Sequence, residues 1–234
     1  MGETLLALEA VTLTAPEGQV VFQDLDWRLE RGERRFVRGG FGGGCSALLR
    51  LCAGIAEPGQ GRVLLAGAPL EAGQAHPFLA RGDLGWVPSD GGLAVNLTLL
   101  DNVALPLRYA RNLGRGEAER TAMAWLELAG LGSRALHRPS VPGERECWAA
   151  SLARAAAKGS RLWLVDRPAG GLDLASIAAA EAILERAAAD PEVAMLLVGD
   201  AWMARFGQEL QVGTGRVGPA PGRRESADAR GGEP

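Results

Sequence analysis

The sequence predicts an α/β protein with a mixed, mainly parallel β-sheet, an antiparallel β subdomain and an inserted helical subdomain. Strand patterns alternate with helical patterns through most of the chain, two strand patterns joined by a short turn open it, and a purely helical block interrupts it at about 96–157. With 234 residues, 47% of them hydrophobic, the chain can form one large domain, which we place at 1–216.

The first half of the chain supplies most of the strands. The turn Pro-Glu-Gly-Gln joins the first two, which predicts an antiparallel pair. A later strand leads into a glycine-rich turn and then a helix at 45–54, which Gly54 ends. Strands are expected at 5–15, 19–30, 34–39, 61–67 and 84–88.

The second half is helical at first and then returns to alternation. Apolar residues recur at helical spacing in four segments, and two short apolar runs between or after them are typical of buried strands. The last residues, 217–234, are rich in Gly, Pro and charge and predict a disordered tail. Helices are expected at 99–112, 116–132, 144–158 and 174–190, and strands at 161–166 and 193–200.

The glycine-rich turn has the spacing of a phosphate-binding loop, G-x-x-x-x-G-K-[ST]. Gly39, Gly44 and Ser46 match, Gly42 adds a further glycine, and Cys45 stands where the lysine is expected. Backbone amides at a helix start attract anions, but the lysine adds a full charge that a thiol lacks. Two interpretations follow: a plain turn that needs glycine, which we favour, or residual binding of an anion or nucleotide.

A second motif, "RLWLVDRPAGGLD", runs from Arg161 to Asp173. An apolar strand that ends in aspartate, here Asp166, is where phosphate-loop proteins hold magnesium. The next residue is Arg167, whose positive charge would repel a divalent cation. We favour an ion pair of Arg167 with Asp166 or Asp173 over a contact with phosphate.

Together, the two motifs resemble those of the nucleotide-binding subunit of an ATP-binding cassette (ABC) transporter, over roughly 5–217. The segment "DNVALPL" is similar to one in the lipid-transporting and lipoprotein-releasing members of the family. The resemblance implies a nucleotide site whose remnants are Gly39, Gly42, Gly44, Cys45, Ser46, Asp166 and Asp173. It also implies contacts with a transmembrane permease subunit at Asn96, Thr98, Asp101, Asn102 and Leu105.

The same resemblance implies that the family's working positions have changed. Glutamate is the expected general base and arginine cannot act as one. The substituted positions are Cys45 for the phosphate-binding lysine, Ser89 for a glutamine, Pro142, Gly143, Glu144, Arg145 and Glu146 for the signature Leu-Ser-Gly-Gly-Gln, Arg167 for the glutamate, and Gly199 for the switch histidine.

The composition limits the partners and the location. A net charge of −3 gives no electrostatic case for nucleic acid. We see no signal peptide, and no apolar run reaches the roughly 18 to 20 residues that span a bilayer. The three cysteines do not have metal-ligand spacing, and neither do His76 and His137. For Cys45 we favour the role of a small neutral filler over that of a reactive thiol. The resemblance implies a peripheral protein at the cytoplasmic face of the inner membrane.

We therefore predict a degenerate subunit of a lipid-handling membrane transporter complex, with a structural or regulatory role and little or no ATP hydrolysis. In the family, the glycine loop of one subunit meets the signature of another, so we expect a dimer with an active homologue or with itself. We expect no cofactor beyond weak binding of ATP and Mg²⁺. Three alternatives stay open: an active ATPase with divergent motifs, a scaffold outside transport, and an anion-sensing module.

Overall fold

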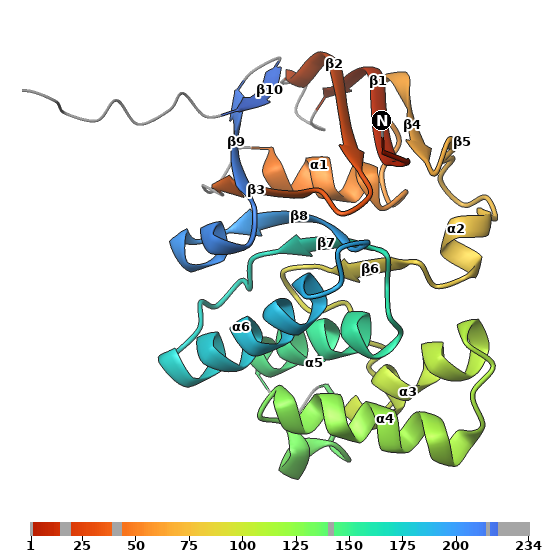
Figure 1. Ribbon diagram of the computed structural model, residues 1–234, viewed down its shortest axis with the longest axis vertical. Helices are drawn as coiled ribbons and strands as arrows, with labels where there is room; N and C mark the ends of the chain where they lie inside the picture. The colour runs from red at the N-terminus through yellow and green to blue at the C-terminus, as the bar shows by residue number, and fades with distance from the viewer. Residues whose placement is uncertain (1, 15–19, 39–43, 140–142, 214–215, 220–234) are drawn as a thin grey trace, which may run out of the picture.

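The computed structural model describes residues 2–14, 20–38, 44–139, 143–213 and 216–219. Its elements form three levels along the long axis in Figure 1: an antiparallel sheet, a six-stranded sheet and a set of helices. Helix α1 (Cys45–Cys52) lies between the two sheets, and the other long helices lie on the far side of the six-stranded sheet.

The antiparallel sheet has the strand order β2-β1-β4-β5. Leu8 is opposite Trp27 on β2 and opposite Val63 on β4, so β1 is the inner strand. The predicted antiparallel start is confirmed. The bounds are β1 Thr4–Thr14, β2 Val20–Glu30, β4 Gln60–Leu65 and β5 Ala68–Pro69.

The six-stranded sheet has the order β10-β9-β3-β8-β7-β6 and is parallel except for the β9–β10 pair. This confirms a mainly parallel sheet. The β9–β10 hairpin was not predicted, and β10 takes up the first residues of the predicted tail, of which 220–234 lie outside the described residues. The bounds are β3 Arg34–Arg38, β6 Leu84–Val87, β7 Leu162–Asp166, β8 Ala194–Gly199, β9 Gln208–Gly213 and β10 Arg216–Pro219.

Two hydrophobic cores lie on the two faces of this sheet, because alternate side chains of a strand point to opposite faces. On β3, Phe36 belongs to the core shared with the lower helices, whereas Val37 belongs to the core shared with α1 and the antiparallel sheet. Both side chains are at most 1% exposed. The sheet is therefore covered on both faces, as parallel sheets require.

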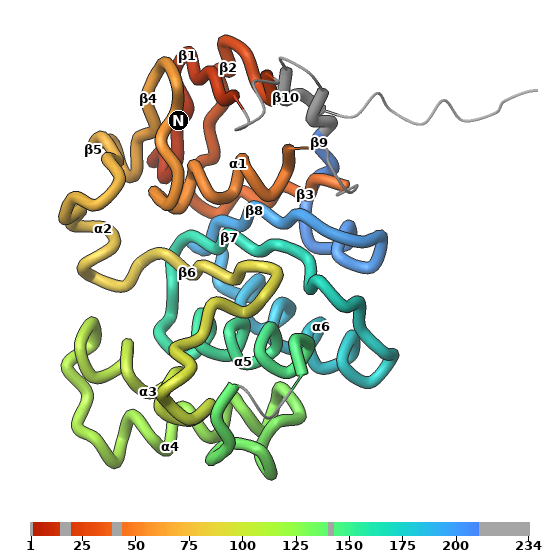
Figure 2. Tube along the Cα trace, turned by 180° about the vertical axis from the view of Figure 1, so that it is seen from behind, coloured from red at the N-terminus to blue at the C-terminus, as the bar shows by residue number. Residues whose placement is uncertain are grey.

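The helical region that the sequence predicts at 96–157 contains α3, α4, a 3-10 turn and α5. Figures 1 and 2 show α3 and α4 side by side at the end of the molecule farthest from the antiparallel sheet, while α5 also contacts β6 and α6. The bounds are α2 Pro77–Ala80, α3 Leu99–Ala110, α4 Arg115–Leu128, η1 Gly132–Arg134, α5 Glu144–Ala157, α6 Leu174–Ala188 and η2 Ala201–Phe206.

Candidate functional site: a nucleotide-site region with altered residues

The glycine-rich turn ends in a described residue, Gly44, which is the N-cap of α1 in the left-handed conformation with φ 73°. A Cβ at this position would lie 2.2 Å from Cγ1 of Val21, so a side chain would be strained in both backbone and space. Gly39 and Gly42 lie outside the described residues. Gly44 is therefore required for structural reasons, whether or not the turn binds a ligand.

Cys45 begins α1 and is 7% exposed. Burial raises the pKa of its thiol, and the negative charge of Asp166 raises this pKa further. The thiol therefore stays protonated at neutral pH, as expected for a small filler and not for a reactive cysteine.

Asp166 ends β7 and is 3% exposed, so burial raises the pKa of its carboxyl group. A hydrogen bond with the Ser46 side chain acts in the opposite direction and lowers the same pKa. The backbone N–H of Arg167 donates to Oδ1 of Asp166 at 3.0 Å. The fold thus brings Cys45 and Ser46, at the start of α1, to the aspartate.

Arg167 faces a partner that the sequence analysis did not name. Its Nη1 lies 4.0 Å from Oδ1 of Asp200, the residue that follows β8. Its charge also lowers the pKa of Asp166. The predicted pair with Asp173 is not among the ion pairs of the described residues; Asp173 lies 3.7 Å from Nη1 of Arg145 instead.

Gly199 ends β8 and Ser89 follows β6, and these two strands are the neighbours of β7. Gly199 ends β8, and a Cβ there would lie 2.1 Å from Sδ of Met203, which is fully buried. The carbonyl of Ser89, after β6, accepts a hydrogen bond from the N–H of Ala169 at 3.1 Å. Neither residue supplies an imidazole or a side-chain amide.

The segment in the place of the signature begins α5, with Gly143 as N-cap. Pro142 lies outside the described residues. Glu144 is exposed at the first helical position, Glu146 pairs with Arg134 of η1, and Arg145 pairs with Asp173. These residues line a groove of about 790 Å³ between the segment that follows α4, which includes η1, and the starts of α5 and α6.

Asp173 is the N-cap of α6, because its Oδ1 accepts from the N–H of Ser176 at 2.8 Å. This hydrogen bond is the main reason that its pKa lies below the usual range. Asp173 therefore has a local structural role in addition to its pairing with Arg145.

The predicted permease contacts divide into buried and exposed residues. Asn102 is 4% exposed, and its side chain bonds to the N–H and C=O of Ala94 and to the C=O of Thr98, at 2.7, 3.0 and 2.9 Å. In this structure its side-chain amide holds the preceding loop, and the predicted contact of Asn102 with a permease stays a prediction. Thr98 and Asp101 form the cap of α3, whereas Asn96 and Leu105 are exposed.

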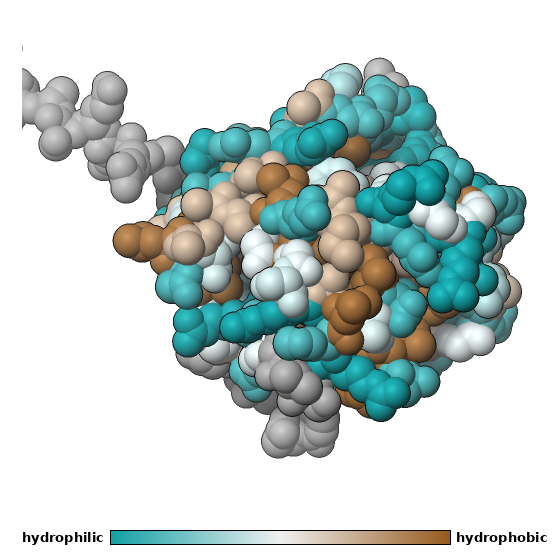
Figure 3. Space-filling model, turned by 90° about the horizontal axis from the view of Figure 1, so that it is seen from below, coloured by the Kyte–Doolittle hydropathy of each residue, from teal (hydrophilic) through white to brown (hydrophobic). Residues whose placement is uncertain are grey.

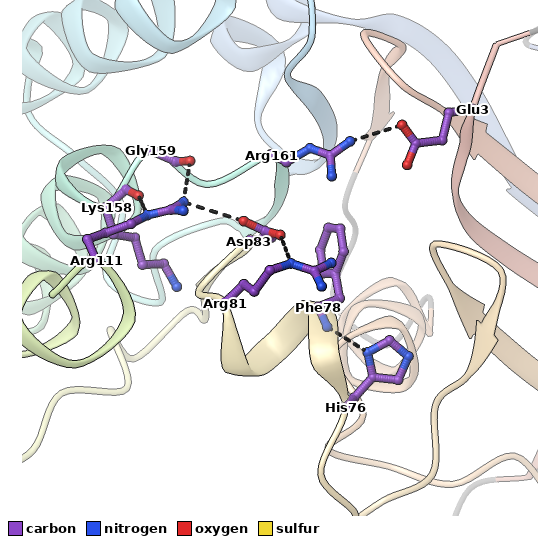
Figure 4. A network of polar contacts seen from close by, with 9 residues as sticks. All are labelled: Glu3, His76, Phe78, Arg81, Asp83, Arg111, Lys158, Gly159 and Arg161. Atoms are coloured by element: carbon purple, nitrogen blue, oxygen red, sulfur yellow. Dashed lines mark hydrogen bonds and ion pairs between the residues drawn. The ribbon is translucent and has the colours of Figure 1, made fainter.

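Sequence reasoning missed a network of hydrogen bonds and ion pairs around Lys158, which is the only lysine in the chain. Asp83 accepts from Arg81 at 2.9 Å and from Arg111 at 3.5 Å, and Arg111 also donates to the carbonyls of Lys158 and Gly159 (Figure 4). The Lys158 ammonium donates to the carbonyl of Leu84. Polar residues at the ends of α3 and α5 and before β6 were the available signal.

Within the described ranges, the chain has no cluster of three or more His, Cys, Asp or Glu side chains placed to hold a metal ion. The helices of those same ranges include none that is long and apolar enough to cross a membrane.

Comparison with known proteins identifies the family. The model of the ABC transporter family matches residues 22–170. The chain is 35% identical to the lipoprotein-releasing system ATP-binding protein LolD of Pseudomonas syringae pv. tomato, over 78% of this chain and 81% of the relative. It is 34% identical to LolD of Shewanella oneidensis, over 75% and 78% of the two chains.

Among solved structures, a dimeric ATP-binding cassette in a post-hydrolysis state with ADP and Pi has a TM-score of 0.79. It is 24% identical, with 91% of this chain and 96% of that chain covered, and at this identity the likeness shows the fold alone. The fold, the match to the family model and the identity to curated relatives agree. The chain therefore belongs to the ABC transporter family, as a nucleotide-binding domain.

Proposed function

We propose that this chain is a catalytically silent ABC subunit of a membrane transporter, with a structural or regulatory role. Arg167 is the observation that carries the proposal. Its backbone N–H contacts the carboxylate of Asp166, and its guanidinium lies 4.0 Å from Asp200. A cation in this position repels Mg²⁺, and a guanidinium cannot take a proton from water. At position 45 a phosphate-binding loop would have the positive charge of a lysine, whereas the thiol of Cys45 is neutral.

ATP hydrolysis by the purified protein with Mg²⁺ tests the proposal. We expect the same background rate for the wild type and for Asp166→Asn, and we expect Cys45→Lys alone not to raise it, since residue 167 would still be arginine. A wild-type rate above background that Asp166→Asn abolishes would overturn the proposal and favour an active ATPase. Titration with a fluorescent ATP analogue separates a nucleotide- or anion-binding module from one that binds neither.

A transmembrane permease is the proposed partner, at the cytoplasmic face of the membrane. Support comes from the exposed end of the molecule at α3 and the loop before it, where Val95, Leu105 and Tyr109 are 71%, 39% and 74% exposed. Figure 3 views the molecule from the side of α3 and α4 and shows apolar residues among polar ones there. The relatives are ATP-binding proteins of a lipoprotein-releasing system, so we propose lipid or lipoprotein as the cargo.

Cross-linking from this surface tests the partner. Photo-reactive residues at Asn96 and Leu105, both exposed, are expected to capture a membrane protein in intact cells. The same probe at Glu57, exposed beyond α1, is the matched control and is expected not to. Capture of soluble proteins alone from positions 96 and 105 would contradict the proposal.

In a dimer, the altered signature would also impair the partner's site. The guanidinium of Arg145 pairs with Asp173 of the same chain. Glu144 would repel the phosphate of a nucleotide bound to the partner, because both are negatively charged. We expect the ATPase rate of a complex with an active homologue to be low and unchanged by Arg145→Ala. A normal rate that Arg145→Ala abolishes would show that Arg145 acts on the partner's nucleotide.

A further inference from the structure

We infer that Arg154 is a positioning residue: it holds the loop between β6 and α3, residues 88–98, in one conformation and thereby presents Val95 and Asn96 to the partner. The inference rests on the proposed contact with a permease. It adds that this surface is already formed in the free chain and does not depend on nucleotide. Val95 is 71% exposed and Asn96 is exposed as well, so both are accessible to a partner.

Arg154 lies in the last turn of α5 and reaches the first half of the loop. Its Nη1 donates to the carbonyl of Gly92 at 3.0 Å, and its Nη2 donates to the carbonyl of Gly91 at 3.4 Å. The same Nη2 donates to Oγ of Ser151 at 2.9 Å, which orients the guanidinium. Burial lowers the pKa of Arg154 from 12.5 to about 10, so the group keeps its charge at neutral pH. Since a charged donor makes stronger hydrogen bonds than a neutral one, two consecutive carbonyls of the loop are held firmly to α5.

The two glycines of the loop also lie close to their neighbours. Gly91 has a φ of 82° and Gly92 a φ of 52°, which glycine adopts more readily than other residues. At Gly91 the backbone is so close to α5 that a Cβ would lie 2.6 Å from the carbonyl carbon of Cys147. The N–H of Gly91 donates to the carbonyl of Pro88 at 3.0 Å. The loop is therefore packed against α5 at the point where Arg154 binds its carbonyls.

The second half of the loop is held from α3. Asn102, in the first turn of α3, bonds to the N–H and the C=O of Ala94 at 2.7 and 3.0 Å. The N–H of Leu97 donates to the same carbonyl at 3.1 Å, and α3 itself packs against α5. Val95 and Asn96 thus lie on a loop that is held on both sides of them, by α5 through Arg154 and by α3 through Asn102.

The loop is joined to the region of the nucleotide site through its backbone. The carbonyl of Ser89 accepts from the N–H of Ala169 at 3.1 Å, and a serine lacks the side-chain amide of the glutamine that the family resemblance implies there. A ligand shifts a loop only by binding one of its conformations more tightly than another. Because Arg154 and Asn102 both stabilise a single conformation, we expect the loop to be the same with and without nucleotide.

Amide hydrogen exchange in the full chain tests the inference. We expect the amides of 91–97 to exchange about tenfold or more faster in Arg154→Met, which keeps an apolar stem and removes the donors. The amides of β7 and α6 should keep their wild-type rates, because the opening is local. Arg50→Met, at an exposed arginine of α1, is the matched control and should change neither set. Gly199→Ala controls for a general loss of stability and should leave 91–97 at wild-type rates.

Two further measurements separate this inference from the proposed function. ATP with Mg²⁺ should leave the exchange of 91–97 unchanged. In intact cells, photo-capture of a membrane protein from position 96 should fall about threefold or more in Arg154→Met, whereas capture from position 105, within α3, should persist. The inference fails if Arg154→Met leaves the exchange of the loop unchanged, if Gly199→Ala accelerates it equally, or if nucleotide alters it. ATP hydrolysis, or no membrane capture from the wild type, would contradict the proposed function and not the role of Arg154 in the loop.

Discussion

The indole Nε1 of Trp148 donates a hydrogen bond to the backbone carbonyl of Asp166, with 2.7 Å between nitrogen and oxygen. Trp148 is in the second turn of α5 and is fully buried, and Asp166 is the last residue of β7. The contact therefore fixes α5 to the end of β7.

Trp148→Phe keeps most of the buried aromatic volume but leaves the carbonyl of Asp166 without its donor. We expect the free energy of unfolding to fall by about 1–3 kcal/mol, the cost of an unsatisfied buried polar group plus some lost packing. Urea unfolding measures it. Trp125→Phe, at a half-buried indole that lies against Arg186, is the control and is expected to cost less. Equal losses in the two variants would contradict this role.

Lys158 makes stability depend on pH. Burial, followed by the charges of Arg154 and Arg111, lowers its pKa from 10.5 to about 8. Between these two values the unfolded chain binds more protons than the folded chain, so the free energy of unfolding rises with pH and the cost of the buried charge is fully present below about 8. Asp83 faces the same ammonium and acts in the opposite direction.

Urea unfolding at about pH 7.5 and pH 9 checks this expectation. Lys158→Met is expected to remove the rise, and no other lysine can produce one. Measurements stay below about pH 9 because burial raises the pKa of Cys52 to about 12, which makes stability fall at higher pH. A rise that persists in Lys158→Met would assign it to another group.

Asn102→Ala removes the side chain that holds the loop before α3. We expect a loss of about 1–3 kcal/mol in the free energy of unfolding, because the N–H and C=O of Ala94 lose their partner. Limited proteolysis should then cut the loop at 94–98 faster. Asn96→Ala, in the same loop but exposed, is the matched control and is expected to leave both measurements unchanged.

Gly199→Ala places a methyl group where the Met203 sulfur lies. Since the two atoms would be 2.1 Å apart and Met203 is fully buried, we expect a loss of about 1–3 kcal/mol in thermal or urea unfolding. Gly199→Ala with Met203→Ala should cost less than the sum of the two single changes. Gly116→Ala, inside α4 with only Arg120 nearby, is the control and should not destabilise. Additive losses at 199 and 203 would show that the two side chains do not compete.

Periodicity and turn residues were enough to predict the long elements. Parallel strands place their carboxyl ends at one edge of a sheet, so the start of α1, which follows β3, and the aspartate that ends β7 lie at the same edge. Helix α2 was missed because it has four residues, with His76 as an unusual N-cap. The β9–β10 hairpin was missed because its glycines and polar residues are as typical of a tail as of strands.

The ion pair of Arg167 with Asp200 could be predicted only from the order of the strands in the sheet. Asp200 follows β8 and Arg167 follows β7, and these two strands are neighbours, so the residues after them are neighbours too. The chain alone does not state which strands are adjacent, and Asp173 was nearer in sequence. The role of Asn102 in its own loop was not predicted, because a side chain that bonds to its own loop has the same residue type as one that bonds to a partner.

The contact between Gly199 and Met203 bears on how this chain could evolve. The family resemblance implies a histidine at the position of Gly199, and in this chain the thioether of Met203 lies where any side chain on residue 199 would begin. A larger residue fits at 199 only if that sulfur moves or if a smaller residue first replaces Met203. An evolutionary path from glycine to a larger side chain at 199 therefore passes through a change at 203 or through a strained core.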